Sequence, residues 1–177
     1  MELKQRSKRS NQRGTSLIEL MIACLVLMVG VAGVVSLIPI AIGANYRNRQ
    51  QSNSTVIAQM VMEKILSVPA GGAAPALVLN DCTPTTFNIS TAGGGAPLLA
   101  SGDVNFTAAA PAGYSMTYAA CGPAGGAQSV YDVRWNIQTP SAFVKLITVS
   151  AKLRGSGPNM NMFSLPVTIR SMSGQGS

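Results

Sequence analysis

The chain has 177 residues and a formal net charge of +7, and it contains no histidine. The absence of histidine excludes Ser–His–Asp and Cys–His nucleophile schemes and the common histidine-based metal sites. The few acidic residues show no spacing typical of a catalytic carboxylate pair or a calcium loop, so we expect no enzyme, metal or cofactor. Much of the positive charge lies in residues 1–14, which leaves no basic patch downstream and disfavours nucleic-acid binding, although nucleic acid stays open as a partner.

A basic leader is followed directly by an apolar run. Residues 1–14 hold five Lys or Arg residues against one acid, and they end at Gly14. Five residues later comes Glu19, at the start of the apolar segment Leu20–Ala44, which contains one hydroxyl and no charge. Basic residues beside a first apolar segment hold that end in the cytoplasm. An ionised acid at the edge of a membrane-length segment costs solvation free energy, which indicates that Glu19 has a function.

The apolar run 20–44 exceeds the roughly 20 residues that a membrane-spanning helix needs. It is also longer than the apolar core of an ordinary secretory signal, which runs about 7–15 residues. Two alternatives stay open from the residues alone. One is a cleaved signal ending at the small residues 41–44, and the other is a plain signal anchor without processing.

The helical pattern continues beyond the apolar run. After a polar stretch at 45–55, four apolar residues at helical spacing predict a buried stripe: Ile57, Val61, Ile65 and Val68. The run Pro69-Ala70-Gly71-Gly72 should end this helix. We therefore predict a leader at 1–14, a long helix at 15–68 whose residues 20–44 span the membrane, and a globular domain at 69–177.

Residues 70–128 are rich in Gly, Ala, Pro, Ser and Thr, which predicts loops. Short strands are expected at 85–90, 104–107 and 114–118. Cys82 and Cys121 lie in the part that would be outside the cell, where disulfides persist, and we predict that they are bonded. Cys24 lies in the apolar run and should pack as a small hydrophobic residue.

Apolar and polar residues alternate in three segments of the last third: 131–137, 145–153 (from Ile147 on) and 163–170. Period two with Gly, Pro and Ser between the runs predicts an antiparallel sheet of about three to four strands with one wet face. The helical stripe should cover the dry face, with Trp135 in the core. Pro166 suggests that the third strand lies at an edge or pairs poorly at that point, and residues 171–177 should fray.

The residues from the leader to Ala23 resemble a type IV pilin precursor with a class III signal peptide. The resemblance rests on the basic leader closing on Gly14 and on the following Thr15-Ser16-Leu17-Ile18-Glu19-Leu20. It implies that a prepilin peptidase cleaves between Gly14 and Thr15, N-methylates Thr15, and leaves Glu19 at the fifth mature position. It also implies a pilin-like α+β fold, with the long helix packed on a C-terminal sheet.

Residues 58–66, 131–137 and 145–151 resemble PilV-like minor pilins and type II secretion pseudopilins. Two residues depart from the common pattern: Thr15, where phenylalanine is commonest, and Ser36, where major pilins carry proline. Both fit a minor subunit at least as well as a major one. The resemblance implies a minor pilus subunit in the inner membrane, with its N-terminus cytoplasmic, that later enters a pilus at the cell surface. Its partners would be other pilins, the prepilin peptidase, the inner-membrane assembly platform and lipid. A secretion pseudopilin and a membrane-anchored binding domain outside any filament are the alternatives.

We predict that Glu19 acts in the assembly of subunits into a filament. A free amine at Thr15 and the carboxylate of Glu19 would both lose solvation in lipid. If the amine of a neighbouring subunit reaches Glu19, the two charges offset each other, more strongly in a low dielectric than in water. We expect this pair to set the axial step between subunits.

Overall fold

The computed structural model describes residues 16–71, 75, 77–155 and 165–174. The leader, Gly14, Thr15 and Phe163 lie outside the described residues. The chain forms two compact units, Met1–Asn45 and Tyr46–Ser177.

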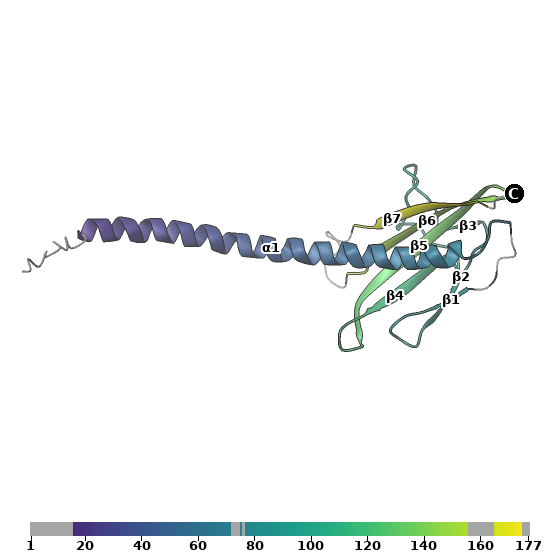
Figure 1. Ribbon diagram of the computed structural model, residues 1–177, viewed down its shortest axis with the longest axis horizontal. Coiled ribbons are helices and arrows are strands. Elements are labelled where there is room, and N and C mark those ends of the chain that lie inside the picture. The colour runs from purple at the N-terminus through teal and green to yellow at the C-terminus, as the bar shows by residue number, and fades with distance from the viewer. Residues whose placement is uncertain (1–15, 72–74, 76, 156–164, 175–177) are drawn as a thin grey trace, which may run out of the picture. The chain divides into compact units, whose positions relative to one another are not determined.

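Helix α1 runs from Leu17 to Leu66, close to the predicted bounds of 15–68 (Figure 1). Ser16 accepts the first intrahelical bonds through its carbonyl, and amides of the next turns follow in register. At the other end the amides of Ser67 and Val68 still donate to Glu63 and Ile65, and Pro69 follows. Proline cannot continue the bonding pattern, which explains the stop.

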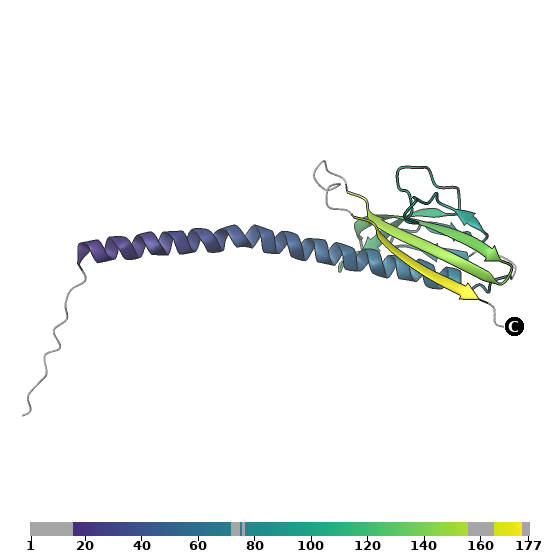
Figure 2. The same cartoon turned by 90° about the horizontal axis from the view of Figure 1, so that it is seen from above.

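In the part of the second unit that the structure describes, seven strands form (Figure 2): β1 Leu77–Asn80, β2 Thr86–Ile89, β3 Gly94–Gly95, β4 Ser115–Cys121, β5 Ala127–Ser141, β6 Val144–Leu153 and β7 Val167–Gly174. Strands β1 and β2 form a small hairpin sheet of their own. The other five form an antiparallel sheet in the order β3-β5-β6-β7, with β4 also paired to β5. The long strand β5 therefore has β4 beside its first half and β3 beside its second half.

One face of this sheet packs on the second half of α1, as predicted. The odd-numbered positions of β5 and β6 and the helical stripe share one core, whose members include Ile57, Val61, Ile65, Tyr131, Val133, Trp135, Ile137, Ile147 and Val149. One polar bond joins the sheet to the helix, and a second joins the sheet to the residue that follows β2. The Tyr131 hydroxyl donates to Gln50 Oε1 of the helix at 2.9 Å, and the Trp135 indole N–H donates to the Ser90 carbonyl at 3.0 Å.

The opposite face was expected to be wet, and this prediction is wrong for its centre. Thr148 and Ser150 are buried, and carbonyls within residues 96–108 accept hydrogen bonds from side chains of the same face. Arg134 donates to the Ala108 carbonyl at 2.6 Å and stacks over the Phe106 ring, and Asn136 donates to the Ala96 carbonyl at 2.9 Å. Arg134 and Asn136 therefore bind backbone carbonyls of a loop in place of water, and the Ser150 hydroxyl hydrogen-bonds to the Thr168 hydroxyl of β7.

The strand predictions need four further corrections. Residues 104–107 form no strand, and only an isolated Leu98–Val104 bridge occurs there. Strands β1 and β3 were not expected. Strand β7 extends to Gly174, so residues 171–174 pair with β6 where fraying was predicted, and Leu165, expected on the apolar face, is exposed. The edge position of β7 directly after Pro166 agrees with the prediction.

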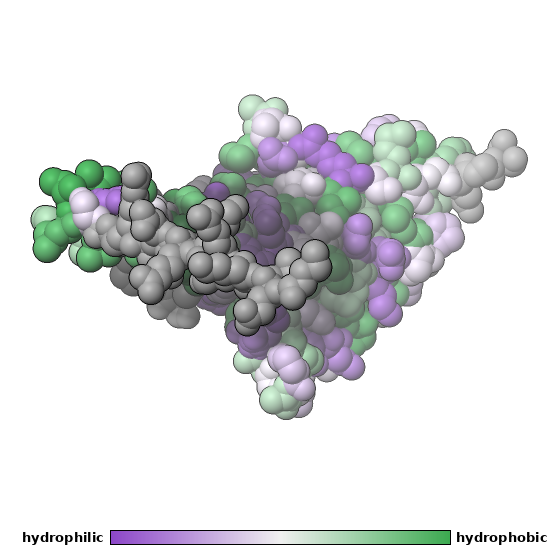
Figure 3. Space-filling model, turned by 60° about the vertical axis from the view of Figure 1, so that its left-hand side comes forward, coloured by the Kyte–Doolittle hydropathy of each residue, from purple (hydrophilic) through white to green (hydrophobic). Residues whose placement is uncertain are grey.

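Hydrophilic and hydrophobic residues are interspersed over the visible face of the strand-rich unit (Figure 3). Most of the large apolar side chains of this unit are buried in its own core cluster. This contrasts with residues 17–44, whose apolar side chains are exposed throughout.

The contact between helix and sheet can be tested at Ile65, which is fully buried. Replacing Ile65 by Ala should lower the free energy of unfolding by roughly 2–5 kcal/mol, because it removes methyl groups and leaves a cavity. The measurement is denaturant unfolding of the full chain in detergent micelles, followed by the fluorescence of Trp135. Val56→Ala on the exposed side of the same helix is the control, and an equal loss in both variants would contradict the packing role.

Candidate functional site

The start of α1 places Glu19 in the first helical turn. Its amide donates to the Ser16 carbonyl at 2.9 Å and lies 3.4 Å from the Ser16 hydroxyl oxygen, so Ser16 caps the helix. A carboxylate in the first turn interacts favourably with the positive end of the helix dipole, by about 0.3–1 kcal/mol at an exposed site. The Ser-x-x-Glu spacing is a recognised capping signal, and the sequence reasoning overlooked it.

The residues that follow form an apolar rod. The described residues up to Asn45 are all exposed, and within that stretch no charge follows Glu19. Among the described residues, one helix, α1, is long and apolar enough to cross a membrane by length and composition. Exposed apolar surface of this extent requires lipid or other helices to cover it.

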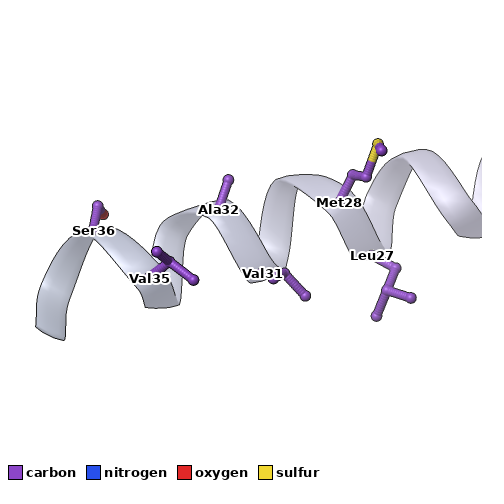
Figure 4. A pocket seen from close by; sticks show the side chains of 6 residues that line it. All are labelled: Leu27, Met28, Val31, Ala32, Val35 and Ser36. Carbon is purple, nitrogen blue, oxygen red and sulfur yellow. The ribbon is translucent and has the colours of Figure 1, made fainter.

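A shallow groove runs along this rod between two rows of side chains spaced four residues apart (Figure 4). One row contains Leu27, Val31 and Val35, and the other Met28, Ala32 and Ser36. The Ser36 hydroxyl donates to the Gly33 carbonyl at 2.8 Å, so its polarity is satisfied within the helix. Rows at this spacing form the ridges and grooves by which helices interdigitate.

Residues 9–35 match the prokaryotic N-terminal methylation motif family. The match includes Gly14, Thr15 and Glu19 and the first part of the apolar rod. This match supports a type IV pilin-like precursor with a class III signal peptide. Searches of curated proteins and of solved structures found no match.

Pilin-like precursors of this kind are structural proteins. The apolar N-terminal helix of this chain is suited to membrane anchoring, and the motif connects the chain to pilus or secretion machinery in general. Within the described ranges, no cluster of three or more His, Cys, Asp or Glu residues could hold a metal ion.

A covalent staple lies in the strand-rich unit. Cys82, just after β1, and Cys121, at the end of β4, are joined in a disulfide with their Cα atoms 5.4 Å apart. The bond ties the β1–β2 hairpin to the main sheet. Cys24, in contrast, is a free and exposed thiol on the apolar rod.

Asp81 strengthens the same attachment. One carboxylate oxygen accepts from the Ala119 amide of β4 at 3.1 Å, and the other accepts from the Thr83 amide and hydroxyl. Burial alone would raise the pKa of Asp81, but these hydrogen bonds outweigh it and hold the pKa below its ordinary value. The hairpin is thus held by a covalent bond and by a carboxylate that stays ionised.

Removing the staple should destabilise the chain strongly. The disulfide closes a loop with a sequence separation of 39. The chain-entropy estimate for such a loop is roughly 3–4 kcal/mol. We expect the Cys82→Ala, Cys121→Ala double variant to lose about this much free energy of unfolding, measured by denaturant titration in detergent. Cys24→Ala is the control, and equal stability of the double variant and the control would contradict the prediction.

Proposed function

We propose that the chain is a minor structural subunit of a type IV pilus. Prepilin peptidase would cleave it after Gly14, and the subunit would then enter the filament through α1. The observation that carries the proposal is the coincidence of the methylation motif at residues 9–35 with an uncovered apolar helix bearing one acid in its first turn. The departures at Thr15 and Ser36 from the commonest pilin residues fit a minor subunit at least as well as a major one.

The proposal divides the chain by role. Residues 1–14 are a cytoplasmic leader, residues 15–68 are the assembly helix with its span at 20–44, and residues 69–177 form the exposed domain. Before assembly the protein lies in the inner membrane as a single-pass subunit, and afterwards it lies in the pilus. Its partners are other pilin subunits, the peptidase, which also methylates Thr15, and the assembly platform.

Glu19 acts in this proposal as the device that sets the register. Cleavage creates an amine at Thr15, and a neighbouring subunit's amine would pair with the Glu19 carboxylate. At 4 Å such a pair is worth about 4 kcal/mol at an effective dielectric constant of about 20. An apolar rod without further charge offers no competing partner for that amine along residues 20–44.

Recovery of the processed subunit in filaments tests the proposal. Sheared surface filaments should yield an N-terminal peptide that begins at Thr15, with or without a methyl group, by mass spectrometry. The same peptide confined to the inner membrane together with loss of protein export on deletion would support a secretion pseudopilin instead. An intact leader and no filament association would support a membrane-anchored binding domain and overturn the proposal.

The role of Glu19 is tested by Glu19→Val. We expect membrane insertion and cleavage after Gly14 to persist, while incorporation into sheared filaments falls below detection, because the amine of the neighbouring subunit loses its partner. Quantitative immunoblotting of membrane and filament fractions measures both. Glu63→Val, at an exposed acid of the same helix, is the matched control. Normal incorporation of the Glu19 variant would refute the register role.

A further inference from the structure

We propose that the strand-rich unit carries a binding site for a carboxylate group, centred on Lys145. The site is a cavity of about 290 Å³ near the turn between β5 and β6, lined among others by Gly71, Thr91, Gly93, Thr139, Ser141 and Lys145. These residues come from three separate parts of the chain, at 71, 91–93 and 139–145, and none of the lining residues is acidic.

Lys145 is a buried cation that lacks a carboxylate among the described residues. Only 6% of its surface is exposed, and its one hydrogen bond runs to the Thr91 carbonyl at 3.5 Å. The two ion pairs in the described part of the chain use Arg134 and Arg170. An ammonium group has three donors, so two of them are unfilled here. Burying a charge without a partner is costly, which favours an anion arriving from outside.

The surroundings of Lys145 add further donors. The Thr91 hydroxyl is buried and has no hydrogen-bond partner within the described residues. Thr139 and Ser141 bring two more hydroxyls to the cavity wall. A carboxylate accepts several hydrogen bonds through its two oxygens, so it can satisfy the ammonium and a hydroxyl together.

Gly93 keeps part of this cavity open. A Cβ atom at this position would lie 3.2 Å from the Thr139 hydroxyl oxygen, closer than ordinary van der Waals contact. A side chain at Gly93 would therefore push against Thr139, whose hydroxyl lies in the cavity wall. Replacing Gly93 by Ala therefore narrows the cavity and leaves the charge of Lys145 unchanged.

The charge balance selects a carboxylate over a phosphate. One buried ammonium neutralises one negative charge, which matches a monoanionic carboxylate. A phosphate at neutral pH carries more charge and commonly takes an arginine fork or a nest of backbone amides. Two sources can supply such a group: a free small acid, or an Asp or Glu side chain of a neighbouring subunit.

The single tryptophan reports on the site. The Trp135 indole N–H donates to the carbonyl of Ser90, the residue before Thr91, and it gives one indole cross-peak in a ¹H–¹⁵N spectrum. Sodium acetate titrated into the full chain in detergent micelles should shift this cross-peak saturably. Sodium chloride at equal ionic strength should not. An acetate shift that is absent, or equal to the chloride shift, would overturn the proposal.

Variants decide whether Lys145 is the centre. Lys145→Met should weaken acetate binding about ten- to a hundredfold, as expected when a charge-assisted hydrogen bond is lost, and Gly93→Ala should weaken it with the lysine present. Lys152→Met, on the same strand, is the control and should bind normally. Circular dichroism verifies the fold of each variant. Acetate binding by Lys145→Met as tight as by the natural chain would overturn the assignment.

The source of the carboxylate is tested in assembled filaments, and only this step rests on the proposed function. A carbodiimide joins an amine directly to a carboxylate that touches it. A cross-linked peptide pair containing Lys145 and an acidic residue of a neighbouring subunit would assign the site to a contact between subunits. Acetate binding without such a cross-link would assign it to a free acid. Failure to form filaments would refute the proposed function and leave the acetate result standing.

Discussion

The globular unit depends on one contact, the burial of the helical stripe at residues 57–65 against the odd-numbered face of β5 and β6. The sheet presents Tyr131, Val133 and Trp135 on this face, and without a cover they would be exposed to water. The cover comes from the same helix that begins at Leu17. The two halves of this one helix therefore have different roles. The first half is an apolar rod that lipid or other helices must cover, and the second half carries the stripe that covers the sheet. The change of pattern after Ala44, from apolar on all sides to apolar on one side, marks the division.

The sequence predicts this part of the fold well because two periodicities carry it. Alternation in β5 and β6 and the spacing of four, four and three in the helix each indicate one buried face, and packing joins them. The outer face of the sheet was mispredicted because Arg134, Asn136 and Thr148 are polar, and polarity does not distinguish water from a loop carbonyl as partner. Strand β3 could not be predicted either. Gly94 and Gly95 pair with β5 at φ values of +124° and +128°, and a Cβ at Gly95 would meet the Trp135 carbonyl, so the pairing depends on the absence of side chains.

The functional residues that are contiguous in the sequence could be predicted from it. Those that only the fold brings together could not. The junction Gly14–Glu19 is contiguous in sequence and needs no tertiary information. The cap at Ser16 was equally local and was overlooked. The cavity at Lys145, however, unites residues near 71, 91, 139 and 145, whose proximity arises only when β5 turns into β6. In the sequence Lys145 is simply one lysine at the start of an alternating strand, on the register that the fold buries.

The apolar rod explains why a register device would have to be polar. Lipid tails are as apolar as leucine, so moving residues 20–44 from a bilayer into a bundle of helices gains little hydrophobic free energy. Packing of rows such as Leu27, Val31 and Val35 into grooves stabilises association, but equivalent rows recur every few residues along the rod and would permit several axial offsets. A single carboxylate does not recur. Under the proposed function, Glu19 is the only charge from residue 17 to residue 44, so its pairing with one amine would distinguish one offset from all the others.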